Sequence, residues 1–180
     1  VEGKPRVGIV STGDELVRPG DEIDSDRGEI YDVNSTTIAA GVAEAGGEPV
    51  LYPHAGDDYD EMERLLRRAA DECDLVLSSG STSASAVDVI YRVIEARGDL
   101  LLHGVAVKPG KPMLIGRIDR GGSEADALDT DTSDVDADGT GSNDGRDAGE
   151  SAYVGLPGYP VSALTIFRTF VAPAIREAAG

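Results

Sequence analysis

Short apolar runs alternate with longer amphipathic stretches along most of the chain. The apolar runs span residues 7–10, 49–52, 75–77, 100–103, 113–118 and 152–156. Runs of this length are typical of buried strands, and the stretches between them are long enough for helices. The order therefore predicts an α/β fold, a three-layer α/β/α arrangement in which helices cover both faces of a mostly parallel, twisted sheet.

Four amphipathic stretches carry apolar residues at helical spacing. Asn34 or Ser35 is expected to cap the first helix, which Gly46 and Gly47 end, and Asp58 is expected to cap the second. The expected core positions of the four helices are Ile38, Val42 and Ala45; Met62, Leu65, Leu66, Ala69 and Cys73; Ile90, Val93 and Ile94; and Leu164, Phe167, Val171 and Ile175.

Residues 119–150 break this pattern. They hold eleven acidic residues, two arginines and no apolar period, so they cannot bury enough apolar surface to order themselves. They are expected to be a disordered insertion between two strands of a single domain that spans residues 1–180. A calcium loop is disfavoured, because the glycine and the glutamate that an EF-hand needs at its sixth and twelfth positions are missing.

Charge and composition exclude several classes of function. A net charge of −18 argues against a nucleic-acid binder that works through phosphate contacts. An acidic surface so poor in lysine fits a protein adapted to high salt, where charge repulsion is screened. One cysteine and two histidines provide neither a disulfide nor a zinc site. No signal peptide and no membrane span is expected, and the cytoplasm is the expected compartment.

Candidate binding residues follow the apolar runs, because ligands of open α/β sheets bind outside the carboxyl ends of the strands. After the first, second, third and last runs these residues are Thr12, Gly13, Asp14 and Glu15; Asp57 and Asp58; Ser79, Gly80, Ser81, Thr82 and Ser83; and Gly155 to Gly158. Hydroxyls and backbone N–H groups before a helix can hold a phosphate, and carboxylates can hold Mg²⁺. Ordinary helix capping would explain the same residue types.

Lys108 and Lys111 lie three residues apart in a segment that proline stiffens, and the whole chain has only three lysines. A solvated turn would also explain them. Next to a carboxylate-rich edge, they indicate an anionic ligand that a divalent cation bridges to the acids.

The motifs together resemble the molybdopterin-binding domain of the MoeA/gephyrin family, which MogA proteins share. They are STGDEL at 11–16, GEIYDVNS at 28–35, GDD at 56–58, SG at 79–80, KPGKP at 108–112 and GLPGYPVSA at 155–163. The resemblance implies a molybdopterin molybdotransferase, which inserts molybdate or tungstate into adenylylated molybdopterin with release of AMP and the help of Mg²⁺. Family members form dimers, so a homo-oligomer, a dimer or a trimer, is expected.

The resemblance also implies roles for individual residues. Acids would handle Mg²⁺ and the oxyanion, lysines would hold anionic groups, and the hydroxyl-rich loops and prolines would shape the pterin and phosphate pocket. The acids are Glu15, Asp57, Asp58 and Asp88, the lysines Lys108 and Lys111, and the pocket residues Thr12, Gly13, Asp14, Ser79, Gly80, Ser81, Thr82, Ser83, Pro157, Pro160 and Ser162.

The loop after the third run departs from the family pattern, which has glycines where this chain has Ser81 and Ser85. Serine at positive φ costs about 1–2 kcal/mol, and its Cβ can block a phosphate. A pterin-binding or scaffold module without turnover therefore stays open as an alternative. A MogA-type adenylyltransferase and a CinA-like nucleotide hydrolase rank below it, since both lack the KPGKP motif.

Overall fold

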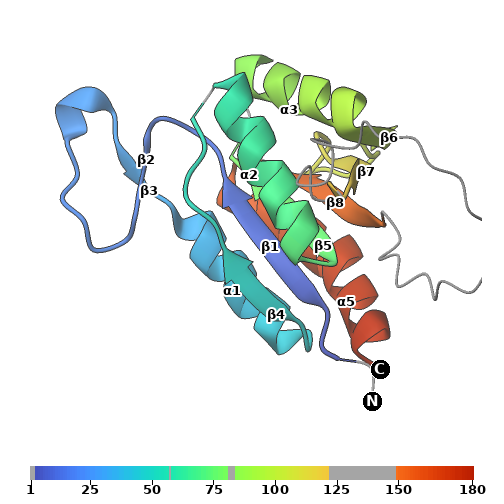
Figure 1. Ribbon diagram of the computed structural model, residues 1–180. Helices are drawn as coiled ribbons and strands as arrows, with labels where there is room; N and C mark the ends of the chain where they lie inside the picture. The colour runs from blue at the N-terminus through green and yellow to red at the C-terminus, as the bar shows by residue number, and fades with distance from the viewer. Residues whose placement is uncertain (1–2, 57, 81–83, 122–148) are drawn as a thin grey trace, which may run out of the picture.

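A six-stranded sheet forms the centre of the molecule (Figure 1). The computed structural model describes residues 3–56, 58–80, 84–121 and 149–180, with the backbone alone for 84–88. The strands follow the order β4-β1-β5-β8-β7-β6. Their bounds are Arg6–Ser11 for β1, Glu48–Leu51 for β4, Leu75–Ser79 for β5, Gly98–His103 for β6, Leu114–Asp119 for β7 and Glu150–Leu156 for β8.

The sheet is mixed. Strands β4, β1, β5 and β8 run parallel, whereas β7 and β6 are antiparallel to their neighbours. The expected α/β fold is confirmed, with parallel pairing over the four strands that lead into the candidate site. The acidic segment joins neighbouring strands as expected, because Asp119 of β7 pairs with Glu150 of β8. The disorder predicted for its interior concerns residues 122–148, which lie outside the described residues.

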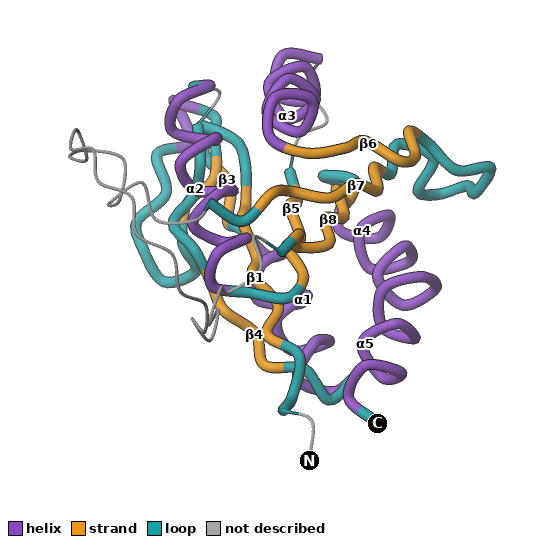
Figure 2. The backbone as a smooth tube through the Cα atoms, turned by 45° about the vertical axis from the view of Figure 1, so that its right-hand side comes forward, coloured by secondary structure: helices purple, strands orange, loops and turns teal. Residues whose placement is uncertain are grey.

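Helices cover both faces of the sheet. Helices α2 (Tyr59–Glu72) and α3 (Ala84–Arg97) pack on one face. The other face carries α1 (Val33–Glu44) and a C-terminal run of α4 (Pro160–Ile166), the π-helical turn η3 (Phe167–Val171) and α5 (Ala172–Ala179). Figure 2 shows α3 and α5 on opposite sides of β8. Among the described residues, no helix has the length and apolar character that a membrane span requires.

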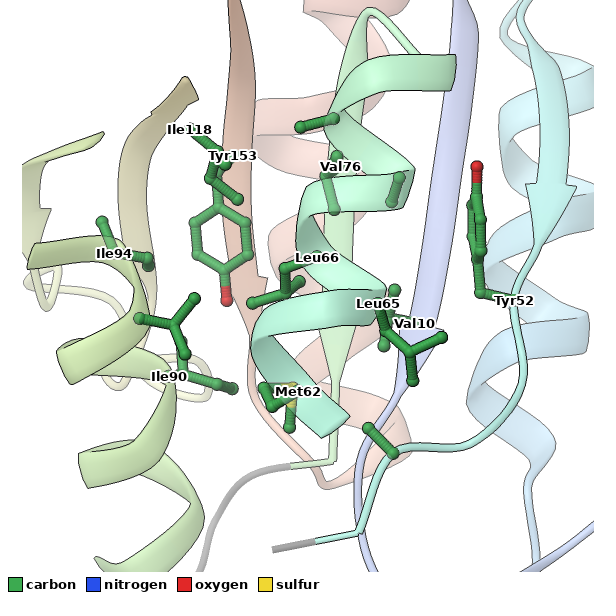
Figure 3. Close-up of a cluster of buried hydrophobic side chains, with 14 of the residues drawn as sticks. Val10, Tyr52, Met62, Leu65, Leu66, Val76, Ile90, Ile94, Ile118 and Tyr153 are labelled. Atoms are coloured by element: carbon green, nitrogen blue, oxygen red, sulfur yellow. The ribbon is translucent and has the colours of Figure 1, made fainter. Parts of the chain in front are cut away.

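Each face of the sheet has its own apolar core, because alternate strand residues point to opposite sides. Val10 and Val76 face α2 and α3, and Figure 3 shows them with Met62, Leu66 and Ile90. Ile9 and Leu77 face α1 and α4 instead. The predicted stripes of all four helices lie in these cores, and of the predicted positions only Leu164 stays partly exposed. Within the first core, the Tyr153 hydroxyl hydrogen-bonds with that of Ser78, which satisfies both buried groups.

A short arm between β1 and α1 was not predicted. It consists of the two-residue strands β2 (Leu16–Val17) and β3 (Ile30–Tyr31), which pair in parallel, and the 3₁₀ turn η1 (Ser25–Arg27). Figure 1 shows the arm standing away from the main sheet. Its strands are too short and too exposed to give a periodic apolar signal.

The arm also explains why the predicted cap of α1 was wrong. The backbone N–H of Asp32 still bonds to the carbonyl of Val17 in the arm, so the helix starts only at Val33. Asp32 is the N-cap residue, and its carboxylate accepts a hydrogen bond from the backbone N–H of Ser35 at 3.0 Å. At α2 the prediction is confirmed, because the Asp58 carboxylate accepts from the N–H of Glu61 at 2.9 Å.

Candidate functional site

The segments singled out in the sequence meet at one edge of the sheet. The parallel strands β1, β4, β5 and β8 all end there. The loop between β6 and β7 opens on the same edge, because β7 runs antiparallel to β8 and Leu114 at its start pairs with Gly155. The expected gathering of the motifs at this edge follows directly from the strand order.

A cleft of about 290 Å³ opens at the middle of this edge, over the ends of β1, β5 and β8. Its lining combines polar side chains with apolar and aromatic residues of the arm and of the segment after β8. The lining residues are Glu15, Leu16, Ile30, Tyr31, Asp32, Val33, Asn34, Ser79, Gly80, Gly158, Tyr159 and Pro160. We call this feature the edge cleft.

The floor of the edge cleft is tightly packed backbone. Thr12 donates its N–H to the carbonyl of Ser79 at 2.8 Å, and Gly13 donates to that of Ala55 at 3.1 Å. Gly80 follows with a φ of 126°, and a Cβ there would lie 2.0 Å from the Thr12 carbonyl oxygen. Only glycine fits at this position, because any side chain would collide with the backbone of Thr12.

Asn34 ties two strand ends together across the cleft. Its side-chain amide donates to the hydroxyl of Ser79 at 2.9 Å and to the carbonyl of Gly158 at 2.7 Å. Ser79 ends β5 and Gly158 follows β8, so a single side chain on α1 sets the spacing between the loops after these strands. Because both bonds join residues far apart in the chain, no local sequence pattern predicted them, although Asn34 belongs to the GEIYDVNS motif.

Two predicted acids, Glu15 and Asp14, follow β1 at this edge of the sheet. Glu15 lines the edge cleft and its carboxylate folds over Gly13, where an added Cβ would lie 2.7 Å from Glu15 Oε2. The Asp14 carboxylate lies beside Gly56, whose added Cβ would be 2.7 Å from Asp14 Oδ1. Asp14 thus faces the loop after β4, the strand end that leads to Asp58.

The described part of the chain contains no group of three or more acidic, histidine or cysteine side chains close enough to hold a metal ion. Asp58 uses one carboxylate oxygen to cap α2. Asp57, Ser81, Thr82 and Ser83 and the side chain of Asp88 lie outside the described residues, so their predicted roles stay predictions. The same holds for the departures from the family pattern at Ser81 and Ser85.

Other predicted residues flank the edge cleft without lining it. Lys108 and Lys111 are exposed in the loop between β6 and β7, on the far side of β8 from Glu15. This loop is anchored by Gly110, where a Cβ would meet Ile166 Cδ1 of α4 at 2.5 Å. Four further predicted residues also stay out of the lining: Thr12 and Pro157 are buried, and Gly13 and Ser162 are partly buried.

Asp32 is a buried carboxylate that lines the edge cleft, and it was not among the predicted binding residues. Burial by itself would raise its pKa, but the polar groups of Ser11 and Ser35 and the nearby His54 outweigh that effect and lower the pKa. The Ser11 hydroxyl lies near the carboxylate without a hydrogen bond. The hydroxyls of Ser11 and Thr12 are both buried, and neither has a hydrogen-bond partner among the described residues.

An α/β domain with a cleft at the carboxyl edge of its parallel strands belongs to the class of small-molecule binding domains. The family model described as a probable molybdopterin binding domain matches residues 8–177. The chain therefore belongs to the molybdopterin-binding domain family, as its motifs predicted.

The relatives make the match more specific. The chain is 34% identical to molybdopterin molybdenumtransferase 2 of Mycobacterium tuberculosis over 98% of its own length and 37% of the relative's. It is 30% identical to molybdopterin molybdenumtransferase of Haemophilus influenzae over 97% of its length and 35% of the relative's. A MoeA molybdopterin biosynthesis protein from Pyrococcus horikoshii superposes with a TM-score of 0.73 at 33% identity, covering 98% of this chain and 36% of that one. The chain thus spans little more than a third of these relatives.

Proposed function

We propose that the chain is the cofactor-binding domain of a molybdopterin molybdotransferase. The intact protein would insert molybdate or tungstate into adenylylated molybdopterin and release AMP. The observation that carries this proposal is the edge cleft, in which Glu15, Asn34, Ser79 and Gly80 gather at the carboxyl edge of the sheet. The support from comparison is a match to molybdenumtransferases over nearly the whole chain.

The edge cleft suits a ligand with a flat heterocycle and phosphate groups. Among the lining residues, Tyr31, Tyr159 and Pro160 offer apolar and aromatic surface. Gly80 also lines the cleft, at the start of the hydroxyl-rich loop proposed to hold the phosphate. Lys108 and Lys111 would neutralise anionic groups of the ligand from the neighbouring loop.

Magnesium would be held by few protein ligands. Mg²⁺ keeps several waters and is commonly bound through one or two carboxylates together with substrate phosphates, so a preformed cage of acids is not required. Glu15 at the rim of the cleft fits this pattern, because its carboxylate is exposed and makes no ion pair among the described residues. We assign Asp57, Asp58 and Asp88 to the same ion as further candidate ligands. The metal would neutralise phosphate charge and polarise the bond that releases AMP.

The test is release of AMP. The intact protein is incubated with adenylylated molybdopterin, Mg²⁺ and molybdate in concentrated KCl, and AMP is measured by chromatography. We expect release to depend on both Mg²⁺ and molybdate, and Glu15→Gln to slow it by about tenfold or more. Glu150→Gln is the matched control, since Glu150 lies at the opposite edge of the sheet and pairs with Arg117.

Two outcomes would contradict the proposal. Tight binding of the ligand without AMP release would favour a pterin-binding module that has lost turnover. Equal release by Glu15→Gln and Glu150→Gln would remove Glu15 from the magnesium site.

A further inference from the structure

Asp32, which lines the edge cleft, forms a pair with the partly buried His54. His54 Nε2 and Asp32 Oδ2 are 3.0 Å apart, and the His54 side chain is 23% exposed whereas that of Asp32 is 1% exposed. A carboxylate has no proton to give, so Nε2 carries the hydrogen and donates it. The other oxygen of Asp32, Oδ1, accepts the backbone N–H of Ser35. Both oxygens of a nearly inaccessible carboxylate are thus engaged.

The pair joins two segments that are distant in the sequence. Asp32 begins α1, and His54 lies in the loop after β4 that leads to Asp58. A buried carboxylate is costly unless it is hydrogen-bonded, so the first turn of α1 is held where His54 and Ser35 meet Asp32. Helix capping alone would need only the bond to Ser35. The bond to His54 fixes the helix start against the sheet edge.

The residue that depends on this anchor is Asn34. It lies in the same turn as Asp32 and makes the two hydrogen bonds, to Ser79 and to Gly158, that bridge the loops after β5 and β8. Asp32 and Asn34 both line the edge cleft. A rotation or fraying of this turn would release the Asn34 amide. The distance between the loops after β5 and β8 would then change.

We propose that Asp32 and His54 are positioning residues of the edge cleft, which act by holding the Asn34 amide on Ser79 and Gly158. The proposal rests on the proposed function only for the identity of the ligand. It predicts that His54, which does not line the cleft, controls the cleft's shape and its affinity.

The first measurement needs no ligand. In the ¹⁵N-labelled protein, the hydrogen-bonded side-chain amide of Asn34 gives a shifted and slowly exchanging NMR signal. We expect His54→Ala to move this signal to the position of a solvated amide and to speed its exchange by tenfold or more, while far-UV circular dichroism stays unchanged. His54→Gln keeps a donor toward Asp32 and is expected to restore the signal. Glu150→Gln is the control and is expected to leave it in place.

The second measurement is the Kd for adenylylated molybdopterin. We expect His54→Ala to raise it about tenfold, the effect of losing one hydrogen bond to a charged group, and His54→Gln to recover most of the affinity. If His54→Ala does not fold, His54→Asn serves instead, because its amide is too short to reach Asp32. An unchanged Asn34 signal in a folded variant would overturn the proposal. Absence of binding by the unmodified protein would overturn the proposed function, and the NMR result would still decide the role of His54.

Discussion

Gly80 shows how strongly a single residue can constrain the site. It has a φ of 126°, and a Cβ would lie 2.0 Å from the carbonyl oxygen of Thr12, which belongs to the neighbouring strand end. Positive φ disfavours every side chain, and the contact is with backbone that cannot turn aside. The floor of the edge cleft therefore depends on glycine at this position.

Gly80→Ala is predicted to lower the free energy of unfolding by about 2 kcal/mol or more, measured by urea denaturation. Gly3→Ala is the control, because no atom lies within 4 Å of a Cβ at Gly3. If the two variants proved equally stable, the packing of Gly80 on Thr12 described above would be wrong.

Asp32 gives a prediction about pH. Its pKa is lowered below the value of 3.8 that an unperturbed aspartate has, so the folded state favours the ionised carboxylate. The stability that this ionised group contributes is present above the unfolded-state pKa and is lost as the pH falls through the lower, folded-state pKa. Asp32→Asn keeps a residue that caps helices well but removes the charge.

We expect the unfolding free energy of the unmodified protein to exceed that of Asp32→Asn at pH 7, and the difference to shrink as the pH falls from about 5 to below 3.8. Urea denaturation of both proteins across this pH range measures the difference. The contributions of the other acidic residues cancel in it, because both proteins share them. A difference that stays constant with pH would show that the charge of Asp32 contributes nothing.

At the scale of elements, the periodic positions of the sequence predicted the main sheet and the helices well. The strands β1 and β5 are buried on both faces, which leaves continuous apolar runs. The amphipathic helices pack as expected because each has one apolar stripe. The arm of β2 and β3 was missed because two-residue strands carry no period.

The candidate site was predicted in part. The rule that ligands bind at the carboxyl ends of parallel strands found Glu15, Ser79 and Gly80, because it depends on strand order alone. It could not find Asn34 or the pair of Asp32 and His54. Their contacts span 22 to 124 residues along the chain and exist only once α1 is docked on the sheet.

Asp58, at the start of helix α2, can have two roles that substitutions separate. The Asp58 carboxylate caps the helix, and we also propose it as a magnesium ligand. Asp58→Ala is predicted to lower the unfolding free energy by about 1 kcal/mol, whereas Asp58→Asn is predicted to leave it nearly unchanged, because asparagine caps as well as aspartate. Urea denaturation measures both values.

Activity distinguishes the second role. If the Asp58 carboxylate binds magnesium, Asp58→Asn requires a higher Mg²⁺ concentration for half-maximal AMP release although its fold is as stable as before. An unchanged magnesium requirement in Asp58→Asn would limit Asp58 to capping.

At the scale of the whole molecule, the charge distribution works against an anionic ligand. The chain carries a net charge of −18, and only three of its cationic residues are lysines. Lys108 and Lys111 lie at the edge where the cleft opens, whereas Lys4 precedes β1 and lies at the opposite edge. Long-range repulsion from the protein must therefore be offset locally, by the two lysines and by Mg²⁺.

Lysine substitutions test this balance. Lys108→Gln and Lys111→Gln are each predicted to raise the Kd for adenylylated molybdopterin severalfold at 0.1 M KCl, and Lys4→Gln is predicted to leave it unchanged. The effect should become smaller at 1 M KCl, because the Debye length falls from about 10 Å to about 3 Å and charges outside direct contact are screened. Isothermal titration calorimetry at the two salt concentrations measures both trends. A loss of affinity that persists in full at 1 M KCl would mean that the lysines touch the ligand directly, and equal effects of all three substitutions would mean that net charge alone governs binding.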